Sequence, residues 1–481
     1  MPILYVTGLT AVLFCFIGLD AAKKVNLMGK APLALYLPLA AHVPLWGYGL
    51  WMGFSSLGVG TAGCVAACVV SGLFCFYLWV RLLLFPVRFP QKVKVRIRFL
   101  MNGRFLVYCA LYAYAALVPV FALLYPFLAR RGVPAGLLIG NAVYAVCIVL
   151  FLFLIGLLFL FVTSKRLGIV RRVVMLLTLW IPIVNFIVFV YACRIAADEY
   201  DFALYKDNLN LTRKEGELCR TKYPLVMVHG IGFRDFRYFN YWGRITRELL
   251  RNGAAVYYGN QEALGTIEYN AGDIKKKIME VMEREGCDKV NIIAHSKGGL
   301  DARYAISVLG MEDHVASLTT MSTPHRGCKF VDKLASIVPE RMYRFIARHF
   351  DNTFRRFGDQ NPDFYTATHQ FCTDVSEVFN REVPNSDKVY YQSYMSKMKS
   401  AWSDSLLSIP YLFIKAVDGD NDGLVSIDSA KWGEFRGVIT APGRRGISHG
   451  DIIDLKREDY NGFDVTETYV KLVHELKEMG F

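Results

Sequence analysis

The chain has 481 residues, of which 54% are hydrophobic and 20% are charged, and its mean hydropathy is +0.29. This composition excludes a disordered protein and a purely soluble one. The formal net charge of +13 would by itself favour a nucleic acid or an anionic membrane surface as a partner. The first 200 residues, however, hold 17 Lys and Arg against three acids. Because the excess charge lies in this apolar half, we expect no nucleic-acid partner.

Six long apolar stretches fill the first 194 residues. A helix needs roughly 20 apolar residues to cross the hydrocarbon core of a bilayer. A buried helix of a soluble protein is usually shorter, and six of them in a row would be unusual. We therefore predict a six-span transmembrane domain over residues 1–194, which makes the chain an integral protein of the cell membrane. The predicted spans are residues 3–20, 32–53, 61–85, 105–128, 137–162 and 173–193.

The basic residues of this half lie mainly in alternate loops. The loops after the first, third and fifth predicted spans carry 13 Lys and Arg, whereas the loops after the second and fourth carry two. Cytoplasmic loops are enriched in Lys and Arg, so the first set of loops is predicted to face the cytoplasm. With six spans, both termini and the large C-terminal part are then extracytoplasmic.

Two polar side chains, His42 and Asn141, fall at depth within the predicted spans. A polar residue in a span can mark a transport pathway or a proton relay. A single His and a single Asn more often form a local hydrogen bond between helices. We therefore interpret the N-terminal half as an anchor.

The second half of the sequence predicts a soluble domain. A polar linker is predicted over residues 195–221, followed by a domain over residues 222–481 that is long enough for one full-size core. Short runs rich in Val, Ile, Tyr and Thr alternate with helical patterns such as 271–285 and 299–309. This alternation indicates a mostly parallel sheet with helices on both faces. The predicted strands are residues 224–229, 254–258, 289–295, 315–323, 388–393, 411–417 and 436–440.

The strand predicted at 289–295 runs directly into Ser296, and a helical pattern follows. Small residues two positions before and two positions after the serine, Ala294 and Gly298, allow the backbone to turn sharply and to expose the hydroxyl. A serine in this strand–turn–helix context is typical of a nucleophile elbow. We predict that Ser296 is a catalytic nucleophile.

A serine hydroxyl needs a general base, usually a histidine, to accept its proton. In a hydrolase with this elbow the acid and then the histidine follow the serine along the chain. His449 lies in a loop after the predicted strand 436–440, where such a fold delivers its base, whereas His474 falls within the C-terminal helical pattern. We therefore predict His449 as the base.

A carboxylate should orient this histidine from a loop between the serine and the histidine. The predicted strand 411–417 ends in a cluster of three acids, Asp418, Asp420 and Asp422. Clustered Asp with Gly and Asn is often plain turn chemistry, and the other two acids are interpreted as turn formers or metal ligands. Asp422 is followed by a glycine and an apolar pair, and we predict that it is the carboxylate that orients His449.

The tetrahedral intermediate of such a reaction needs two backbone N–H donors. One is predicted to come from Lys297, the residue after the nucleophile. The other should come from a loop after an earlier strand, and His229, Gly230 and Ile231 lie at the end of the predicted strand 224–229. The Ile231 N–H is the expected donor, and His229 is expected to brace the loop.

Five segments, VMVHGIGFRDF, NIIAHSKGGLDARY, TTMSTPHRG, GDNDGLVS and ISHGDIID, occur in this order. Together they resemble bacterial triacylglycerol lipases of the α/β-hydrolase superfamily. The resemblance covers most of residues 222–481 and none of the membrane half. It implies an α/β-hydrolase fold, a triad of Ser296, Asp422 and His449, and oxyanion donors at Ile231 and Lys297. His325, in the third segment, is expected to be structural.

The resemblance also bears on metals. Many such lipases hold a structural calcium ion through an Asp two residues after the catalytic His, and Asp451 occupies that position. No other calcium ligand transfers by spacing, and no zinc ligands can be identified. The predicted reaction requires no cofactor, so calcium would have a structural role only.

Residues 330–380 form an insertion rich in aromatic and aliphatic residues mixed with Arg and Lys. In a lipase such a segment could be a lid that opens on a lipid surface. An ordinary helical subdomain packed over the sheet fits the same pattern. The sequence leaves both interpretations open.

These features together predict a membrane-anchored serine ester hydrolase. Its expected substrate is an acyl ester, and a glycerolipid in particular because the anchor holds the site beside lipid. A phospholipase or an acyltransferase with the same triad is an alternative. A membrane transporter or a lipid-binding protein with an inactive hydrolase domain is a further one.

Overall fold

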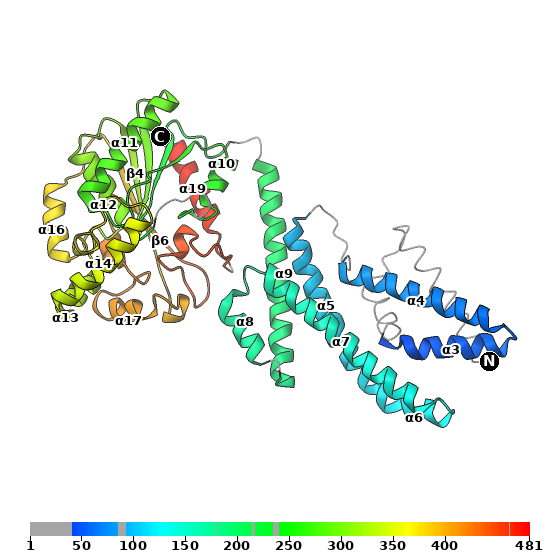
Figure 1. The fold of residues 1–481 in the computed structure, drawn as a ribbon. Coiled ribbons are helices and arrows are strands. Elements are labelled where there is room, and N and C mark those ends of the chain that lie inside the picture. The colour runs from blue at the N-terminus through cyan, green and yellow to red at the C-terminus, as the bar shows by residue number, and fades with distance from the viewer. Residues whose placement is uncertain (1–40, 85–92, 179, 214–216, 234–239, 461) are drawn as a thin grey trace. The chain divides into compact units, whose positions relative to one another are not determined.

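The computed structural model describes residues 41–84, 93–178, 180–213, 217–233, 240–460 and 462–481. The chain divides into two compact units, Met1–Asn208 and Leu209–Phe481 (Figure 1). The division falls inside the predicted linker, residues 195–221. The described part of that linker is helical as far as Arg213, because it continues the last long helix of the first unit.

The described part of the first unit is helical throughout, with short connections (Figure 1). Two of its long helices, α5 and α7, approach closely where two glycines meet. A Cβ atom on Gly103 would lie 2.8 Å from the carbonyl oxygen of Gly156. Small residues allow helix backbones to pack at this distance. The helices are α3 (Val43–Ser56), α4 (Thr61–Leu84), α5 (Val95–Pro119), the π-helical turn η1 (Val120–Leu124), α6 (Tyr125–Arg130), α7 (Ala135–Thr163), α8 (Gly168–Leu177) and α9 (Pro182–Arg213).

Two continuous helical stretches in the described residues, Val95–Arg130 and Ala135–Thr163, are long and apolar enough to cross a membrane. They correspond to the fourth and fifth predicted spans. The first predicted span lies outside the described residues. The sixth, residues 173–193, is wrong as a single helix, because α8 ends at Leu177 and α9 begins at Pro182. Proline favours the first turn of a helix, since it lacks the N–H that a helix interior requires.

The two polar residues of the predicted spans make the local contact expected of them. The Asn141 amide nitrogen lies 2.6 Å from Nδ1 of His42 and donates to the Tyr125 hydroxyl at 2.6 Å. His42 precedes α3, and Asn141 belongs to α7, so the hydrogen bond joins segments far apart in the sequence. The prediction of a hydrogen bond between helices is confirmed.

The second unit contains a six-stranded sheet in the order β2-β1-β3-β4-β5-β6, in which every pair of neighbours is parallel. Helices cover both faces of the sheet (Figure 1). This confirms the predicted parallel α/β fold of the C-terminal half. The strands are β1 (Leu225–Val228), β2 (Val256–Tyr258), β3 (Val290–His295), β4 (Val315–Met321), β5 (Tyr390–Ser396) and β6 (Glu434–Ile439).

The core of this unit consists of two layers, one on each side of the sheet. One layer packs α10 (Ile245–Arg251) and α19 (Val465–Glu478) against the strands, with Trp242 and Tyr469 fully buried. The other packs α11 (Ile267–Glu285) and α12 (Lys297–Ser307) on the opposite face. Parallel strands buried on both faces are expected to be almost continuously apolar, and all four residues of β1 are buried.

The strand predicted over residues 411–417 is wrong. These residues belong to helix α17 (Ser408–Val417), in which Tyr411 and Ile414 are buried. A spacing of three places both side chains on one side of a helix. A short apolar run does not distinguish a strand from a helix by its composition, and here the packing of these two residues favours the helix.

The insertion at residues 330–380 is a set of helices. The connection between α14 and α15 is held on the sheet domain by buried carboxylates, since Asp359 accepts the Leu264 N–H at 3.0 Å and Glu262 accepts the Asn361 N–H at 2.9 Å. These bonds are those of a packed helical subdomain. The helices are α13 (Lys329–Ile337), α14 (Glu340–Arg356), α15 (Phe364–His369) and α16 (Thr373–Glu382). The remaining short helices are η2 (Ala401–Ser403), α18 (Ile427–Ala430) and η3 (Asp451–Ile453).

Candidate active site

Ser296 lies between the last residue of β3 and the first residue of α12. Its backbone has φ 54° and ψ −131°, a conformation that residues with a side chain rarely adopt. Such strain persists only where the surroundings enforce it, and it is expected of the serine in a nucleophile elbow. Ser296 is held here because its N–H donates to the Met321 carbonyl of β4 at 3.0 Å.

Two glycines, Gly298 after the serine and Gly230 in the loop after β1, are required here because the two backbone segments pass very close to each other. A Cβ atom on Gly298 would lie 2.3 Å from the carbonyl oxygen of His229. A Cβ atom on Gly230 would lie 2.9 Å from the Cβ atom of Ser296. Real Cβ atoms do not approach other atoms this closely. The predicted oxyanion loop and the predicted elbow are therefore in direct contact.

Hydrogen bonds brace the loop after β1. The His229 ring lies 2.8 Å from the Gly230 carbonyl oxygen and 3.0 Å from that of Gln261, and the Gln261 amide donates to the His229 carbonyl at 2.8 Å. Ile231 follows and packs partly buried against Ile267 and Leu300. These contacts fix the loop that carries Ile231, and the preceding residue of that loop, Gly230, lies against Ser296.

Lys297 is the first residue of α12, so its N–H lies at the helix N-terminus, where the first backbone donors have no acceptor within the helix. Its side chain is buried and pairs with Asp301 one turn later at 2.5 Å. Burial raises the pKa of Asp301 to about 6, although the ammonium of Lys297 opposes this shift. The pair anchors the first turn of the helix that carries the N–H.

Asp422 and His449 are brought together although 27 residues separate them. His449 Nδ1 lies 2.8 Å from Asp422 Oδ2, and the His449 backbone N–H donates to the Asp422 carbonyl at 2.9 Å. Asp422 follows α17 and His449 follows β6, so two separate loops meet at the carboxyl edge of the sheet. The other two acids of the cluster lie elsewhere in ion pairs, Asp418 with Lys329 and Asp420 with Lys397 and Lys415.

The Asp422 carboxylate is fully buried and has a partner at each oxygen. Oδ1 accepts the backbone N–H groups of Leu424 and Val425 at 3.1 and 3.0 Å, and Oδ2 also accepts the Ser396 hydroxyl at 3.0 Å. Burial by itself would raise the pKa of Asp422. The interaction with His449 and the backbone donors outweigh it, and the pKa is lowered. Asp422 is therefore an anion at neutral pH.

His295 was not predicted as a site residue. It links the Ser296 turn to the pair formed by Asp422 and His449. It directly precedes Ser296, and its ring lies 4.4 Å from the His449 ring between centroids. Its Nδ1 lies 2.6 Å from the Tyr241 hydroxyl. Burial lowers its pKa well below the usual value, with a further contribution from His449. A neutral His295 therefore packs on His449 and brings that imidazole next to the elbow.

Asp451, the predicted calcium ligand, is buried and its oxygens already have donors. Oδ1 accepts the Tyr460 hydroxyl at 2.6 Å, and Oδ2 accepts Arg445 at 2.7 Å and the Ser448 N–H at 3.0 Å. The Arg445 guanidinium in turn lies 3.9 Å from the Tyr460 ring centroid. Calcium binds where several oxygen atoms are free to coordinate it. A site with a guanidinium on its carboxylate does not fit the ion.

Arg445 is expected to stabilise the loop that carries His449 in place of a metal. Replacing Arg445 with Met should lower the free energy of unfolding by about 2 kcal/mol, less than for a fully buried pair because its side chain is 31% exposed. Thermal unfolding measures the loss. Arg436→Met is the matched control, because Arg436 is 29% exposed but pairs with half-exposed acids. A shift in Tm on adding EDTA to the unsubstituted protein would contradict this interpretation.

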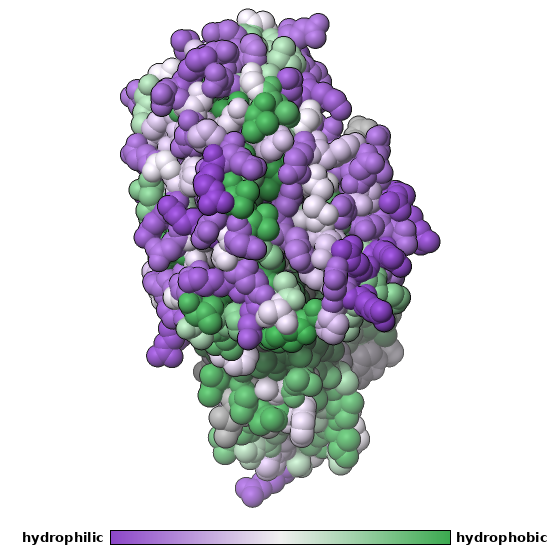
Figure 2. Space-filling view, turned by 90° about the vertical axis from the view of Figure 1, so that its left-hand side faces the viewer, coloured by the Kyte–Doolittle hydropathy of each residue, from purple (hydrophilic) through white to green (hydrophobic). Residues whose placement is uncertain are grey.

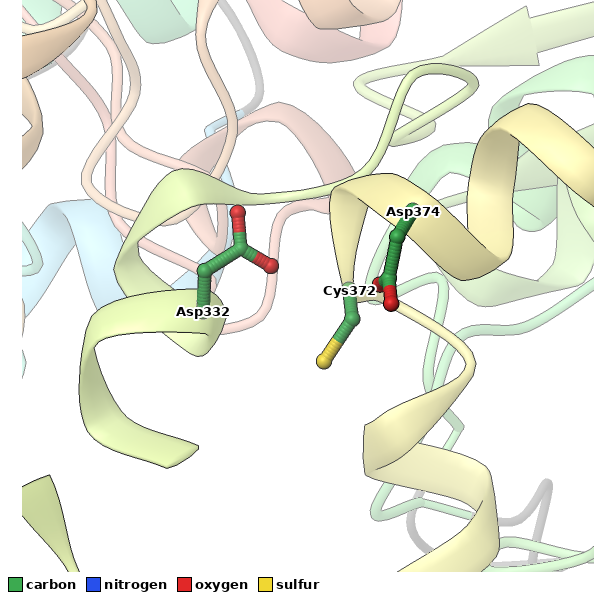
Figure 3. A group of neighbouring side chains, drawn as sticks. All are labelled: Asp332, Cys372 and Asp374. Atoms are coloured by element: carbon green, nitrogen blue, oxygen red, sulfur yellow. The ribbon is translucent and has the colours of Figure 1, made fainter. Parts of the chain in front are cut away.

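A second group of possible metal ligands lies in the helical subdomain, where Asp332, Cys372 and Asp374 come together (Figure 3). Asp332 is already bound by Thr373, whose N–H and hydroxyl donate to its two oxygens at 2.9 and 2.8 Å. Burial, with the neighbouring acids, raises the pKa of Cys372 to about 11. A protonated thiol is a poor metal ligand. The hydrogen bonds from Thr373 to Asp332 hold α13 against the start of α16.

Comparison with known proteins agrees with this architecture. Residues 223–430 match a family model described as the alpha/beta hydrolase fold. The chain is 29% identical over 261 residues to Triacylglycerol lipase 2 of Saccharomyces cerevisiae, which covers 50% of this chain and 74% of that protein. It is 27% identical over 295 residues to a triacylglycerol lipase of Pseudomonas fragi, covering 54% of this chain and 98% of that protein.

A triacylglycerol lipase of Pseudarthrobacter phenanthrenivorans is 30% identical over 178 residues, which are 34% of this chain and 55% of that protein. The chain thus spans about half of this relative and most of the other two. The family match, several lipase relatives and the parallel sheet agree with one another. The C-terminal half of the chain is therefore an α/β-hydrolase domain, and the protein is a carboxylic ester hydrolase.

Proposed function

We propose that the protein hydrolyses acyl esters of lipids through a triad of Ser296, His449 and Asp422. The observation that carries the proposal is the buried hydrogen bond between Asp422 and His449 beside the strained turn at Ser296. A nucleophile, a base and an orienting carboxylate in this arrangement perform acyl transfer. The named relatives are triacylglycerol lipases, which supports a glycerolipid ester as the substrate.

In the proposed reaction the Ser296 hydroxyl oxygen attacks the ester carbonyl carbon while His449 Nε2 takes the hydroxyl proton. The negative charge that develops on the carbonyl oxygen is stabilised by the N–H groups of Ile231 and Lys297. The C–O bond to the alcohol then breaks, and His449 returns the proton to the leaving alcohol. Water, deprotonated by His449, then attacks the acyl carbon. The bond from that carbon to the Ser296 oxygen breaks, His449 returns the proton to this oxygen, and the fatty acid leaves. Asp422 stays ionised and stabilises the imidazolium throughout.

A fluorophosphonate probe tests the assignment of Ser296. The probe should form one covalent adduct, which peptide mapping by mass spectrometry should locate on Ser296, and Ser296→Ala should abolish it because only an activated serine reacts at an appreciable rate. Ser307→Ala, at the far end of the same helix, is the control and should be labelled normally. Undiminished labelling of Ser296→Ala would refute the proposal.

We further propose that the helical unit embeds the protein in a membrane. The two long apolar helices support this. Large hydrophobic side chains are also exposed on the unit, whose surface is mostly hydrophobic in Figure 2. Soluble proteins rarely expose so much apolar surface. On the basis of the loop charges we keep the odd-numbered loops in the cytoplasm and both termini outside. Because residues 173–193 do not form one helix, the last crossing in this proposal runs through α9.

Protease digestion of intact cells is the test of orientation. If the C-terminal unit is extracytoplasmic, added protease should degrade it without permeabilisation of the cells, and an epitope tag at the C-terminus should be lost. A cytoplasmic protein serves as the control for intact cells. Protection of the tag until the membrane is permeabilised would reverse the proposed orientation.

A further inference from the structure

Large apolar side chains project from the segment between β5 and the Asp422 loop. Trp402 in η2 is 94% exposed and Ile409 in α17 is 79% exposed. Leu406 and Leu412 between and beside them are exposed as well. The other side of α17 is anchored in the protein, where Tyr411 and Ile414 are buried. One side of this segment is therefore buried in the protein, and its other side exposes large apolar side chains.

The helical subdomain extends this apolar surface. The Phe330 ring of α13 packs on the Phe413 ring of α17 with centroids 5.7 Å apart, and Lys329 pairs with Asp418. Beyond this contact Ile337 is exposed, and Phe345 of α14 is 74% exposed. Figure 2 shows hydrophobic side chains gathered at the lower end of the C-terminal unit, while most of its remaining visible surface is hydrophilic. We call Trp402, Leu406, Ile409, Leu412, Ile337 and Phe345 the apolar rim.

A strip of positive charge accompanies the rim. Residues 342, 345, 346 and 349 share one side of α14, and Arg341, Arg344, Arg348 and Arg355 share the adjacent side, by the periodicity of a helix. All four arginines are exposed. Residues 329–357 hold seven Lys and Arg against three acids. The net charge of this strip would attract an anionic surface.

The rim also lies on the catalytic side of the domain. The helical subdomain follows β4, and the segment with Trp402 follows β5. Both therefore start from the carboxyl edge of the parallel sheet, the edge at which Ser296 follows β3. The segments that carry the rim and the turn that carries Ser296 therefore leave the sheet at the same edge.

We propose that the apolar rim and the arginines of α14 form a surface that docks the hydrolase domain on an anionic lipid bilayer. Trp402, Ile409 and Phe345 would enter the boundary between headgroups and acyl chains, and the arginines would contact lipid phosphates. Apolar side chains flanked by Lys and Arg bind a membrane interface in this way. The excess of Lys and Arg over acids beside exposed apolar side chains favours an anionic lipid surface as the occupant.

Photocrosslinking in vesicles tests this surface directly. The full chain carrying Ser296→Ala, which cannot consume the lipid, is reconstituted in phosphatidylcholine vesicles with or without phosphatidylglycerol. Benzoylphenylalanine replaces either Trp402 or Ile409, and it replaces the exposed Met279 of α11 as the control. Phospholipid adducts measured by mass spectrometry should be about tenfold more abundant at 402 and 409 than at 279.

Charge-reversal variants test how much the arginines of α14 contribute to lipid contact, separately from the apolar rim. Arg341→Glu combined with Arg348→Glu should reduce the adduct at position 402 in the vesicles that contain phosphatidylglycerol. The matched reversal on α11, Lys275→Glu with Lys276→Glu, should not reduce it. An equal effect of both pairs would overturn the role of α14. Lipid adducts at 402 no more abundant than at 279, or adducts to the helical unit or to a second copy instead, would overturn the proposal.

A kinetic comparison connects the surface to catalysis, and this part rests on the proposed function. In the otherwise unsubstituted protein, Trp402→Ser with Ile409→Ser should slow hydrolysis of triacylglycerol in anionic vesicles about tenfold. Hydrolysis of a short-chain soluble ester should be unchanged. Equal loss on both substrates would overturn a docking role. Absence of hydrolysis in the unsubstituted protein would instead contradict the proposed function and leave the crosslinking result standing.

Discussion

Replacing His449 with Gln is expected to lower kcat for a soluble ester by about 10⁶-fold. Without the imidazole no group takes the proton of the Ser296 hydroxyl, and no group returns it to the leaving alcohol. Glutamine keeps a polar side chain of similar length that can still contact Asp422, so the change removes the base more than the packing. Steady-state hydrolysis of a chromogenic ester measures the effect.

His314→Gln is the matched control for this experiment. His314 precedes β4 at the amino edge of the sheet, away from the loops that carry the predicted triad, so its replacement should leave kcat within about twofold. Thermal unfolding of both variants checks that each is folded. A His449→Gln protein that is folded and keeps a tenth or more of the kcat would exclude His449 as the base.

Asp422→Asn is expected to lower kcat by about 10⁴-fold. An asparagine amide can donate a hydrogen to His449 Nδ1, which would place the imidazole proton on Nε2 and prevent that atom from accepting the Ser296 proton. It would also remove the negative charge that stabilises the imidazolium. Asp428→Asn is the control, since Asp428 lies in the neighbouring helix α18 and pairs with the exposed Lys431. A loss of less than tenfold on Asp422→Asn would show that another group orients His449.

The same variant changes the acid stability of the domain. Because the pKa of Asp422 is lowered in the folded protein, its carboxylate stabilises the fold above the unfolded pKa of about 3.9. That contribution is lost as the pH falls through the folded-state pKa. Asp422→Asn lacks this contribution, so its free energy of unfolding, measured by denaturant titration with circular dichroism, should fall less steeply below about pH 3.9 than that of the unsubstituted protein.

Local sequence patterns were sufficient for most of the C-terminal fold. The run before Ser296, Val290–His295, is apolar at four of its six positions and leads into a turn with small residues, so its strand character and its end in the elbow followed from local rules. The same rules failed at residues 411–417. There the burial of Tyr411 and Ile414 against the rest of the domain selects a helix, and a tertiary contact of this kind cannot be read from seven residues.

The helical half shows the same limit. Hydropathy located the long apolar segments, and two of them are continuous helices of spanning length. It did not locate the interruption between Leu177 and Pro182, because a window of about 20 residues averages over a proline. The pairing of His42 with Asn141, by contrast, was expected from chemistry, since a polar group in an apolar setting needs a partner.

The sequence by itself determined the order of the site: a serine at a strand end, then an acid, then a histidine, each next to turn residues that local chemistry requires. Only the tertiary structure decided which partners surround them. Ser396 contacts Asp422, His295 packs on His449, and Arg445 pairs with Asp451, across separations of 6 to 154 residues. Turn geometry is a short-range property of the chain, whereas the partner of a buried charge depends on which distant segments the core brings together.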